Sequence, residues 1–325
     1  MPLLRMVSLL LSLPFLLFTA SRGDRPGARV EINADAANPY IAAYGRPMVS
    51  AHRSGAGLAP ENTLMAVEAC VNTGRFGIDI FEMDVQLTRD GTLVLLHNDT
   101  FDATSNAKET FGQSRVRPSR YTFKELQALN LGENFSLNGK YPYRGLRGDQ
   151  IPKNLHTAAL EDILRYIEKN TRKAHYIIEI KDSLLQGRKA AGELHRVLKK
   201  LGLLDKAIVG TFHPLLPYYM DRRYPDMPRS ASILECLLFY ARCRLRQPLG
   251  NVKYVALQIP CGEVRWPLNA INFMTKEVIN YAHRHDIAVQ YWTVNRPESV
   301  RLLLENGADA VMTDYPDMAW RVVYG

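Results

Sequence analysis

Short apolar runs alternate with amphipathic stretches along most of the chain. Eight runs have the length and apolar character of strands, namely 47–52, 79–85, 175–180, 207–212, 230–234, 254–259, 288–293 and 309–313. Stretches with helical periodicity lie between them, among them 62–73, 188–201, 275–285 and 297–306. Eight strands that alternate with helices predict a closed (β/α)8 TIM barrel of the α/β class, which needs about 250 residues. We assign the barrel to residues 45–325.

One interval interrupts this alternation. Residues 98–153 are polar and aromatic, rich in Gly, Asn, Arg and Tyr, with little helical periodicity. A segment of this length without regular elements inside a compact domain is commonly functional or mobile. We therefore expect an insertion over the carboxyl-terminal mouth of the barrel. Its middle part, 136–148, is equally consistent with a disordered surface loop.

Residues 1–21 have the pattern of a secretory signal peptide. Arg5 precedes an apolar run at 6–18, and small residues follow at 19–21. The run is shorter than the roughly 20 residues of a bilayer-spanning helix. We expect export to the periplasm or the cell exterior, with a polar entry segment at 22–44. An uncleaved signal anchor stays the alternative, because Phe18 is a poor neighbour for cleavage at Ala20.

The composition is that of a globular protein, with 46% hydrophobic and 23% charged residues. The 41 Lys and Arg exceed the 33 Asp and Glu, and the net charge of +8 suits a phosphate-bearing substrate or contact with an anionic membrane surface. No dense basic run interleaved with aromatics is present, so we expect no nucleic-acid partner. No obligate protein partner is evident. Four cysteines, Cys70, Cys236, Cys243 and Cys261, allow three pairings and show no zinc-site spacing.

The segment from Phe81 to Asn98, FEMDVQLTRDGTLVLLHN, combines strand-like apolar residues with Glu82 and Asp84 two positions apart. Side chains at i and i+2 of a strand point to the same side, so both carboxylates should share one face. His97 ends the next apolar run. Two carboxylates in a partly dry site repel each other, so a positive group is expected between them.

Other polar residues also fall at the ends of predicted strands. His52 and Arg53 end the first, Glu179 and Lys181 the third, and Trp292 the seventh. Catalytic groups of a TIM barrel project from the carboxyl ends of its strands, so these side chains should converge. Each one alone has a simpler explanation, as a solvated carboxylate or a hydrogen-bonded structural histidine.

The residue types fit metal-assisted phosphoryl chemistry. Three carboxylates, Glu82, Asp84 and Glu179, are suited to hold one hard divalent cation, Mg²⁺ or Ca²⁺. His52 and His97 titrate near neutral pH and can exchange protons with an attacking group and a leaving group. Arg53 and Lys181 would add the positive charge that a phosphoryl group requires.

These residues lie in motifs that resemble the glycerophosphodiester phosphodiesterase family. The motifs are AHRSGAGLAPENTLMAV, FEMDVQLTRDGTLVLLHN, YIIEIK, YWTVN and GADAVMTDYP, and they extend over about residues 48–316. The resemblance implies a TIM barrel that hydrolyses glycerophosphodiesters to an alcohol and glycerol 3-phosphate with a bound divalent cation.

By position, the resemblance also implies individual roles. His52 and His97 match the acid/base pair, and we expect His97 to be the acid. The implied metal ligands are Glu82, Asp84 and Glu179, and the implied phosphate or substrate contacts are Arg53, Lys181, Glu61 and Trp292.

The chain departs from the family pattern at two places. Ser54 stands where the family usually has Gly, so the backbone there lacks the conformational freedom of glycine. Asn98 follows the second histidine, where Asp is usual, and the next residues read DATS. The catalytic set is intact, and substrate preference is the property that these changes put in question.

Three alternatives to a glycerophosphodiester phosphodiesterase depend on other sequence features. A lysophospholipase D acting at a membrane would suit the basic charge and the apolar stretch ILECLLFYA, which is equally consistent with a buried helix. A non-enzymatic lipid- or phosphate-binding barrel would be favoured by loss of a histidine or carboxylate, and all are present. A dinucleotide enzyme is disfavoured because no G-x-G-x-x-G follows a strand.

Overall fold

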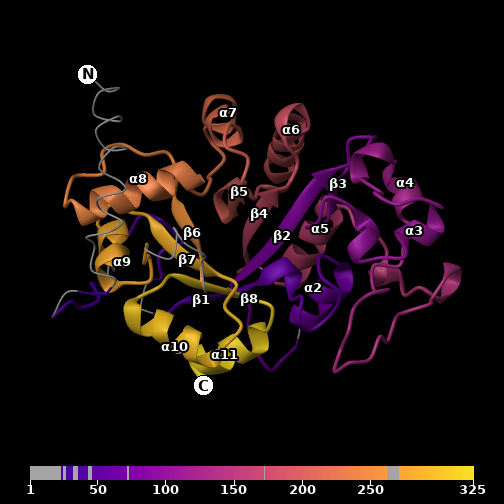
Figure 1. Ribbon diagram of the computed structural model, residues 1–325, viewed down its shortest axis with the longest axis horizontal. Helices are drawn as coiled ribbons and strands as arrows, with labels where there is room; N and C mark the ends of the chain where they lie inside the picture. Colours follow the sequence, from indigo (N-terminus) through magenta and orange to yellow (C-terminus); the bar gives the residue numbers. More distant parts are fainter. Residues whose placement is uncertain are drawn as a thin grey trace.

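The computed structural model describes residues 23–24, 27–31, 36–42, 46–71, 73–171, 173–261 and 271–325. The predicted signal peptide at 1–21 and much of the entry segment lie outside these ranges. None of the helices within them has the length and apolar character that a bilayer crossing requires. The predicted TIM barrel is confirmed (Figure 1).

Seven parallel strands and one antiparallel strand form a single sheet. The strands are β1 (Met48–Ala51), β2 (Ile80–Leu87), β3 (Leu93–Leu95), β4 (His175–Ile180), β5 (Ala207–Gly210), β6 (Ala256–Pro260), β7 (Ala288–Trp292) and β8 (Ala310–Thr313). The parallel strands follow the order β5-β4-β2-β1-β8-β7-β6, and β3 pairs antiparallel with β2. Single parallel bridges at Arg229 and Ser230 connect β5 to β6 and close the ring.

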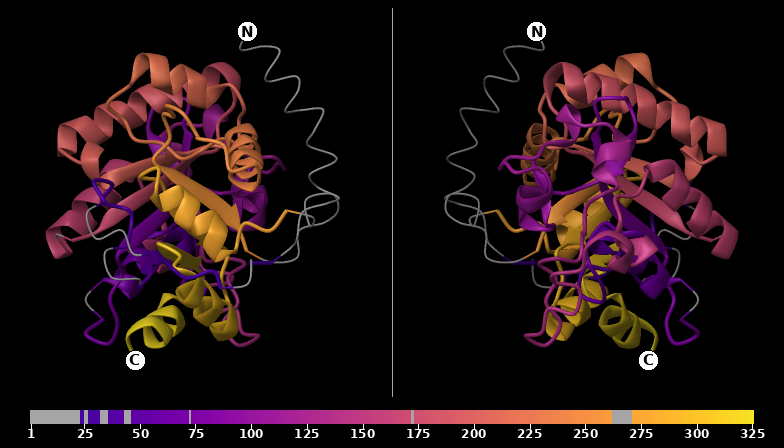
Figure 2. Two further views of the ribbon diagram at one scale, coloured as in Figure 1. Left: turned by 90° about the vertical axis from the view of Figure 1, so that its left-hand side faces the viewer. Right: turned by 90° about the vertical axis from the view of Figure 1, so that its right-hand side faces the viewer.

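Helices surround the strands on the outside of the ring (Figures 1 and 2). They are α2 (Leu64–Cys70), α3 (Ala107–Thr110), α4 (Phe123–Leu126), α5 (Leu160–Asn170), α6 (Leu184–Leu201), α7 (Leu216–Arg223), α8 (Ile233–Arg244), α9 (Lys276–His283), α10 (Pro297–Asn306) and α11 (Pro316–Tyr324). The carboxyl ends of the parallel strands therefore meet at one end of the barrel.

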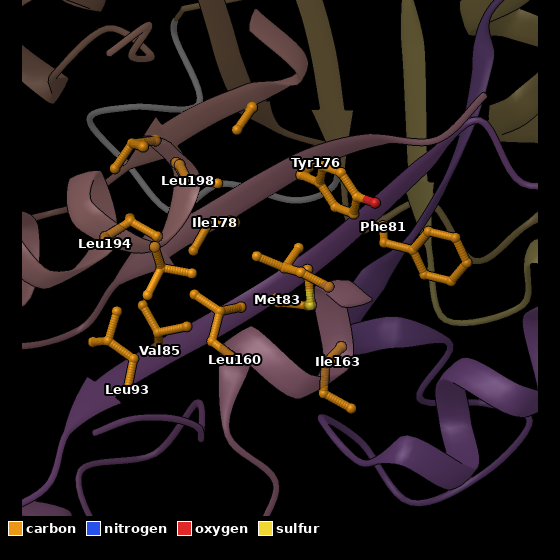
Figure 3. Close-up of a cluster of buried hydrophobic side chains, with 14 of the residues drawn as sticks. Phe81, Met83, Val85, Leu93, Leu160, Ile163, Tyr176, Ile178, Leu194 and Leu198 are labelled. Carbon is orange, nitrogen blue, oxygen red and sulfur yellow. The ribbon is translucent and has the colours of Figure 1, made fainter. Parts of the chain in front are cut away.

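The alternation along β2 separates the core from the barrel interior. Phe81, Met83 and Val85 point outward and pack against residues of β4, α5 and α6 in one buried cluster (Figure 3). Glu82 and Asp84 occupy the opposite face and are nearly inaccessible to solvent. The prediction that both carboxylates share one face is confirmed, because the apolar partners fix the register of the strand.

One predicted strand is wrong. The run 230–234 contributes only the bridge at Ser230, next to the bridge at Arg229, and α8 begins at Ile233. Ser232 and Glu235 form a capping box, in which each side chain hydrogen-bonds the backbone N–H of the other residue. The guanidinium of the buried Arg229 pairs with Asp221 and Glu235 and so links α7 to the start of α8. The apolar stretch ILECLLFYA is helical.

The segment 98–153 is ordered and has a small core of its own. Phe101, Val116, Leu126 and Leu129 pack together with other buried residues beside β3. Its middle part is held by Arg147, which pairs with Glu109 and Glu133, and this argues against a disordered loop. In Figure 1 this segment, with α3 and α4, lies beyond β3 and away from α8 and α9. None of its residues lines the cavity described below.

The four cysteines carry free thiols, so none of the three pairings is formed. Cys70 is buried on α2 and its Sγ lies 3.3 Å from the carbonyl oxygen of Ser54. It serves as a small core residue behind the loop that follows β1.

Candidate active site

A cavity of about 1050 Å³ opens at the carboxyl ends of the parallel strands. Seven of the nine site residues predicted from the sequence line it: His52, Arg53, Glu82, Asp84, His97, Glu179 and Trp292. The other two, Glu61 and Lys181, form ion pairs with the lining residues Arg53 and Glu179. The convergence expected from strand-end positions is therefore present.

His52 directly follows β1 and is held by a carboxylate from the far end of the chain. Its Nδ1 lies 2.7 Å from Oδ1 of Asp314, which follows β8, and Asn295 donates to the other oxygen of Asp314 at 2.6 Å. Burial disfavours the imidazolium, but the hydrogen bond to Asp314 and the charges of Glu82 and Asp314 outweigh that effect and raise the pKa of His52. Nδ1 donates to Asp314, so Nε2 is the nitrogen free for substrate.

His97 reaches the cavity by a different route. The hairpin of β2 and β3 turns the chain back, and His97 lies two residues after β3. Its Nδ1 lies 3.3 Å from the side-chain oxygen of Asn98, a neutral acceptor. Burial and the positive charges of Lys181 and Arg53 lower the pKa of His97, and the charge of Asp84 opposes them only in part. Because the Asn98 oxygen accepts a hydrogen from Nδ1, Nε2 keeps its lone pair.

Polar groups of the neighbouring loop hold the two carboxylates on β2. Glu82 accepts a hydrogen bond from the backbone N–H of Arg53 at 2.6 Å. Asp84 accepts from the side-chain amide of Asn62 at 3.0 Å, and Asn62 in turn accepts from the Asp84 N–H at 3.2 Å. Burial, followed by the negative charge of Asp84, raises the pKa of Glu82 to about 8. These carboxylates are therefore close enough to repel each other.

Glu179 faces Asp84 across the parallel pair of β4 and β2, where the two residues are register partners. Lys181 Nζ lies 2.8 Å from Glu179 Oε1 and 3.6 Å from Asp84 Oδ1. Burial raises the pKa of Glu179 although Lys181 opposes this. Lys181 thus lies between Asp84 and Glu179, whereas the positive group expected from the sequence was one between Glu82 and Asp84.

The loop after β1 carries an unusual backbone. Arg53 and Ser54 have φ of 47° and 66°, both in the left-handed region that favours glycine. This turn aims the Arg53 guanidinium at Glu61, 2.9 Å away, with its Nε 3.9 Å from Asp84. Ser54 adopts the backbone expected of the glycine that the family pattern has there, and its buried hydroxyl has no hydrogen-bond partner.

The carboxylates of the cavity have the chemistry that a divalent cation requires of its ligands. Glu82, Asp84 and Glu179 offer hard oxygen ligands from two adjacent strands, and burial, together with the charge of Asp84, raises the pKa of both Glu82 and Glu179. Glu61 Oε1 is also buried without a partner. Within the described ranges, no three acidic, His or Cys side chains are gathered tightly enough to form a ligand group as placed. The chemistry of the carboxylates fits a cation that would draw them together.

Sequence reasoning did not single out Asp314, Asn295 or Asn62. All three lie within recognised motifs, in TDYP, YWTVN and PENT, but each acts through a contact with another element, from 19 to 262 positions away. His213, which follows β5, has its Nε2 2.8 Å from the carbonyl oxygen of Lys181 and does not line the cavity.

Comparisons with known proteins agree with this geometry. A model of the glycerophosphoryl diester phosphodiesterase family matches residues 52–318. A glycerophosphodiester phosphodiesterase of Caldanaerobacter subterraneus subsp. tengcongensis is 26% identical over 84% of this chain and 96% of its own length. A solved putative family member from Silicibacter pomeroyi has a TM-score of 0.66 at 21% identity, over 87% of this chain and 95% of that one.

An Oleispira antarctica phosphodiesterase, solved in complex with the product sn-glycerol-3-phosphate, has a TM-score of 0.62 at 20% identity and covers 86% of this chain and 98% of that one. At such identities the solved structures support the fold, and the family model decides the membership. The chain belongs to the glycerophosphoryl diester phosphodiesterase family, a family of hydrolases.

Proposed function

We propose that the protein hydrolyses glycerophosphodiesters to an alcohol and glycerol 3-phosphate. The observation that carries the proposal is the meeting of two histidines, three carboxylates and Arg53 in one cavity at the carboxyl end of the barrel. The product complex of the Oleispira antarctica relative supports this choice of chemistry. The leader predicted at 1–21 supports the further proposal that the enzyme acts after export.

Glu82, Asp84 and Glu179 would hold one divalent cation, Mg²⁺ or Ca²⁺. When bound, such a cation supplies positive charge to the phosphate oxygens as negative charge develops on them. Arg53 supplies a fixed guanidinium on the same side, and Glu61 keeps it in place. Lys181 pairs with Glu179 and Asp84 and offsets part of their charge. The excess of negative charge among the carboxylates would otherwise repel the substrate phosphate.

The two histidines have hydrogen-bond partners of different charge, and we assign their roles on this difference. His52, with its pKa raised by Asp314, would donate the proton on Nε2 to the departing alcohol. His97, with a lowered pKa and a lone pair on Nε2, takes the proton of the attacking hydroxyl. This is the reverse of the role that we expected for His97 from the sequence. A general acid needs the proton of an imidazolium, and a general base needs the lone pair of a neutral imidazole.

A substrate panel tests the proposed function. Purified protein is incubated with glycerophosphocholine, glycerophosphoethanolamine and glycerophosphoinositol, each with Mg²⁺, with Ca²⁺ and with EDTA. Release of glycerol 3-phosphate is measured. We expect turnover with at least one diester in the presence of a cation, and loss of turnover with EDTA. Absence of glycerol 3-phosphate under every cation condition would refute the proposal.

A further inference from the structure

The two histidines of the cavity are held in different ways. Nδ1 of His52 lies 2.7 Å from a carboxylate oxygen of Asp314, which follows the neighbouring strand β8. Nδ1 of His97 lies 3.3 Å from the side-chain oxygen of Asn98, which is longer than the usual distance for a hydrogen bond of this kind. This second contact joins two consecutive residues, so it cannot fix their loop relative to the barrel. Another part of the fold must set the position of His97.

His97 lies just past the end of the pairing between β2 and β3 (Figure 1). This pairing reaches Leu95, and one more backbone hydrogen bond, 3.0 Å long, runs from the N–H of Leu96 to the carbonyl oxygen of Asp84. Beyond that bond the chain leaves the sheet, so the sheet no longer supplies donors to its carbonyl groups. Leu96 is buried, and a buried carbonyl group without a donor is costly. The segment that carries His97 therefore needs a donor from a side chain.

The side chain of Gln86 supplies this donor. Gln86 follows the two carboxylates of β2 in the row of side chains that face the interior, and it is buried. Its Nε2 donates to the carbonyl oxygen of Leu96 at 3.0 Å and to that of Asn98 at 2.6 Å. An amide nitrogen carries two hydrogens, so one side chain can satisfy both carbonyl groups. These groups belong to the residues on either side of His97.

The partners of Gln86 set the orientation of its amide. Both are carbonyl oxygens, which accept hydrogen bonds and cannot donate them, so only the NH2 group can face them. The strand beneath is also fixed, because all eight residues of β2 are buried and the strand pairs with β1, β3 and β4. A side chain mounted on such a strand holds a neighbouring loop more precisely than a side chain of another loop would.

We propose that Gln86 is a positioning residue, which fixes His97 at the cavity by binding the backbone on both sides of it. Gln86 does not itself line the cavity, so it acts on the reaction only through His97. The proposal rests on the proposed function, in which His97 takes the proton of the attacking hydroxyl. A general base must lie within about 2.6–3.2 Å of the oxygen that carries this proton. A displacement of about 1 Å can lower the rate by about a hundredfold.

A double-mutant cycle on glycerophosphocholine tests whether Gln86 acts through His97. Gln86→Met keeps the length of the side chain and removes both donors. We expect it to lower kcat about tenfold to a hundredfold with little change in KM, because the base acts in the transition state. In the His97→Ala background it should cost nothing further. Gln186→Met is the control and should leave kcat unchanged, because Gln186 donates to the carbonyl oxygen of Leu87, which does not flank a histidine.

Two results of this cycle would overturn the proposal. An equal loss of kcat in the wild-type and His97→Ala backgrounds would show a structural role that is independent of His97. An unchanged kcat in Gln86→Met would show that the two hydrogen bonds do not matter for the reaction. If Gln86→Met does not fold, Gln86→Asn takes its place in the same cycle, because it keeps the amide on a side chain too short to reach both carbonyl groups.

The NMR signals of the imidazole rings test the position of His97 without turnover. The signals of His52 and His97 are assigned by their loss in the two alanine variants. In Gln86→Met we expect the His97 signal to shift or broaden, while the His52 signal keeps its position and line width. An unmoved His97 signal would overturn the proposal. If the wild type hydrolyses no glycerophosphodiester, the proposed function fails, and this measurement still decides whether Gln86 holds His97.

Discussion

The pairing of His52 with Asp314 predicts a specific change in pH dependence. Asp314→Asn keeps the shape of the side chain and an oxygen acceptor for Nδ1, but removes the charge that stabilises the imidazolium. Both side chains are largely buried, with 12% and 25% exposed, and the contact is 2.7 Å long. A hydrogen bond to a charged group contributes about 1.5–3 kcal/mol, of which a neutral bond keeps roughly half. The difference lowers the pKa of His52 by about one unit.

The pH profile of kcat/KM on glycerophosphocholine shows this shift. If His52 donates its proton, activity is lost as the pH rises through the pKa of His52. The alkaline limb of Asp314→Asn should therefore move about one unit toward lower pH, which lowers kcat/KM there about tenfold, while the acidic limb stays in place. Asp317→Asn is the control, because Asp317 pairs with Arg321 and not with a site histidine.

A different result would refute the assignment. If His52 instead acted in its neutral form, lowering its pKa would increase the active fraction. The middle of the profile would then rise while the alkaline side kept its activity. An unmoved profile in a folded Asp314→Asn protein would show that Asp314 does not control the charge of His52.

Three further predictions concern the carboxylates, the loop after β1 and the leader. In metal-free protein, burial favours the protonated form of Glu82 in the folded state. The stability that this proton binding contributes is complete below pH 4.5 and is lost as the pH rises through about 8. Glu82→Gln should therefore make the melting temperature depend less on pH. Ser54→Gly should relieve the strain of the left-handed backbone and raise the melting temperature by about 2 °C. Ser50→Gly is the control: it also removes an unpaired buried hydroxyl, but from a strand, and it should lower the melting temperature. Amino-terminal sequencing of secreted protein should find a start within residues 22–27, and an intact terminus in a membrane fraction would contradict cleavage.

The sequence was most informative where one strand carries both core and site. On β2 the apolar residues Phe81, Met83 and Val85 need helices on one side, which leaves Glu82 and Asp84 facing the interior. Apolar and acidic residues alternate along this one strand, so the local sequence pattern is enough to predict which side chains face the interior. The same reasoning failed at 230–234, because the capping box of Ser232 and Glu235 was a helix signal that the apolar pattern concealed.

Contacts between distant segments could not be derived from local patterns. Asp314 and His52 are 262 positions apart, and only closure of the barrel between β1 and β8 brings them together. The raised pKa of His52, on which the proposed direction of proton transfer rests, depends on that contact. The cavity likewise combines residues from α8 and from the ends of β5 and β7. Strand-end position predicted which residues meet, but not which pairs would control each other's charge.

Leaving-group rescue tests the central claim most directly. His52→Ala and His97→Ala are compared with the wild type on glycerophosphocholine and on a nitrophenyl ester of glycerol 3-phosphate, whose leaving group needs no protonation. We predict losses on the order of 10² to 10⁴ in kcat for both variants on glycerophosphocholine, and recovery on the nitrophenyl ester for His52→Ala alone. Near wild-type turnover of glycerophosphocholine by either variant, or recovery of His97→Ala instead, would contradict the account.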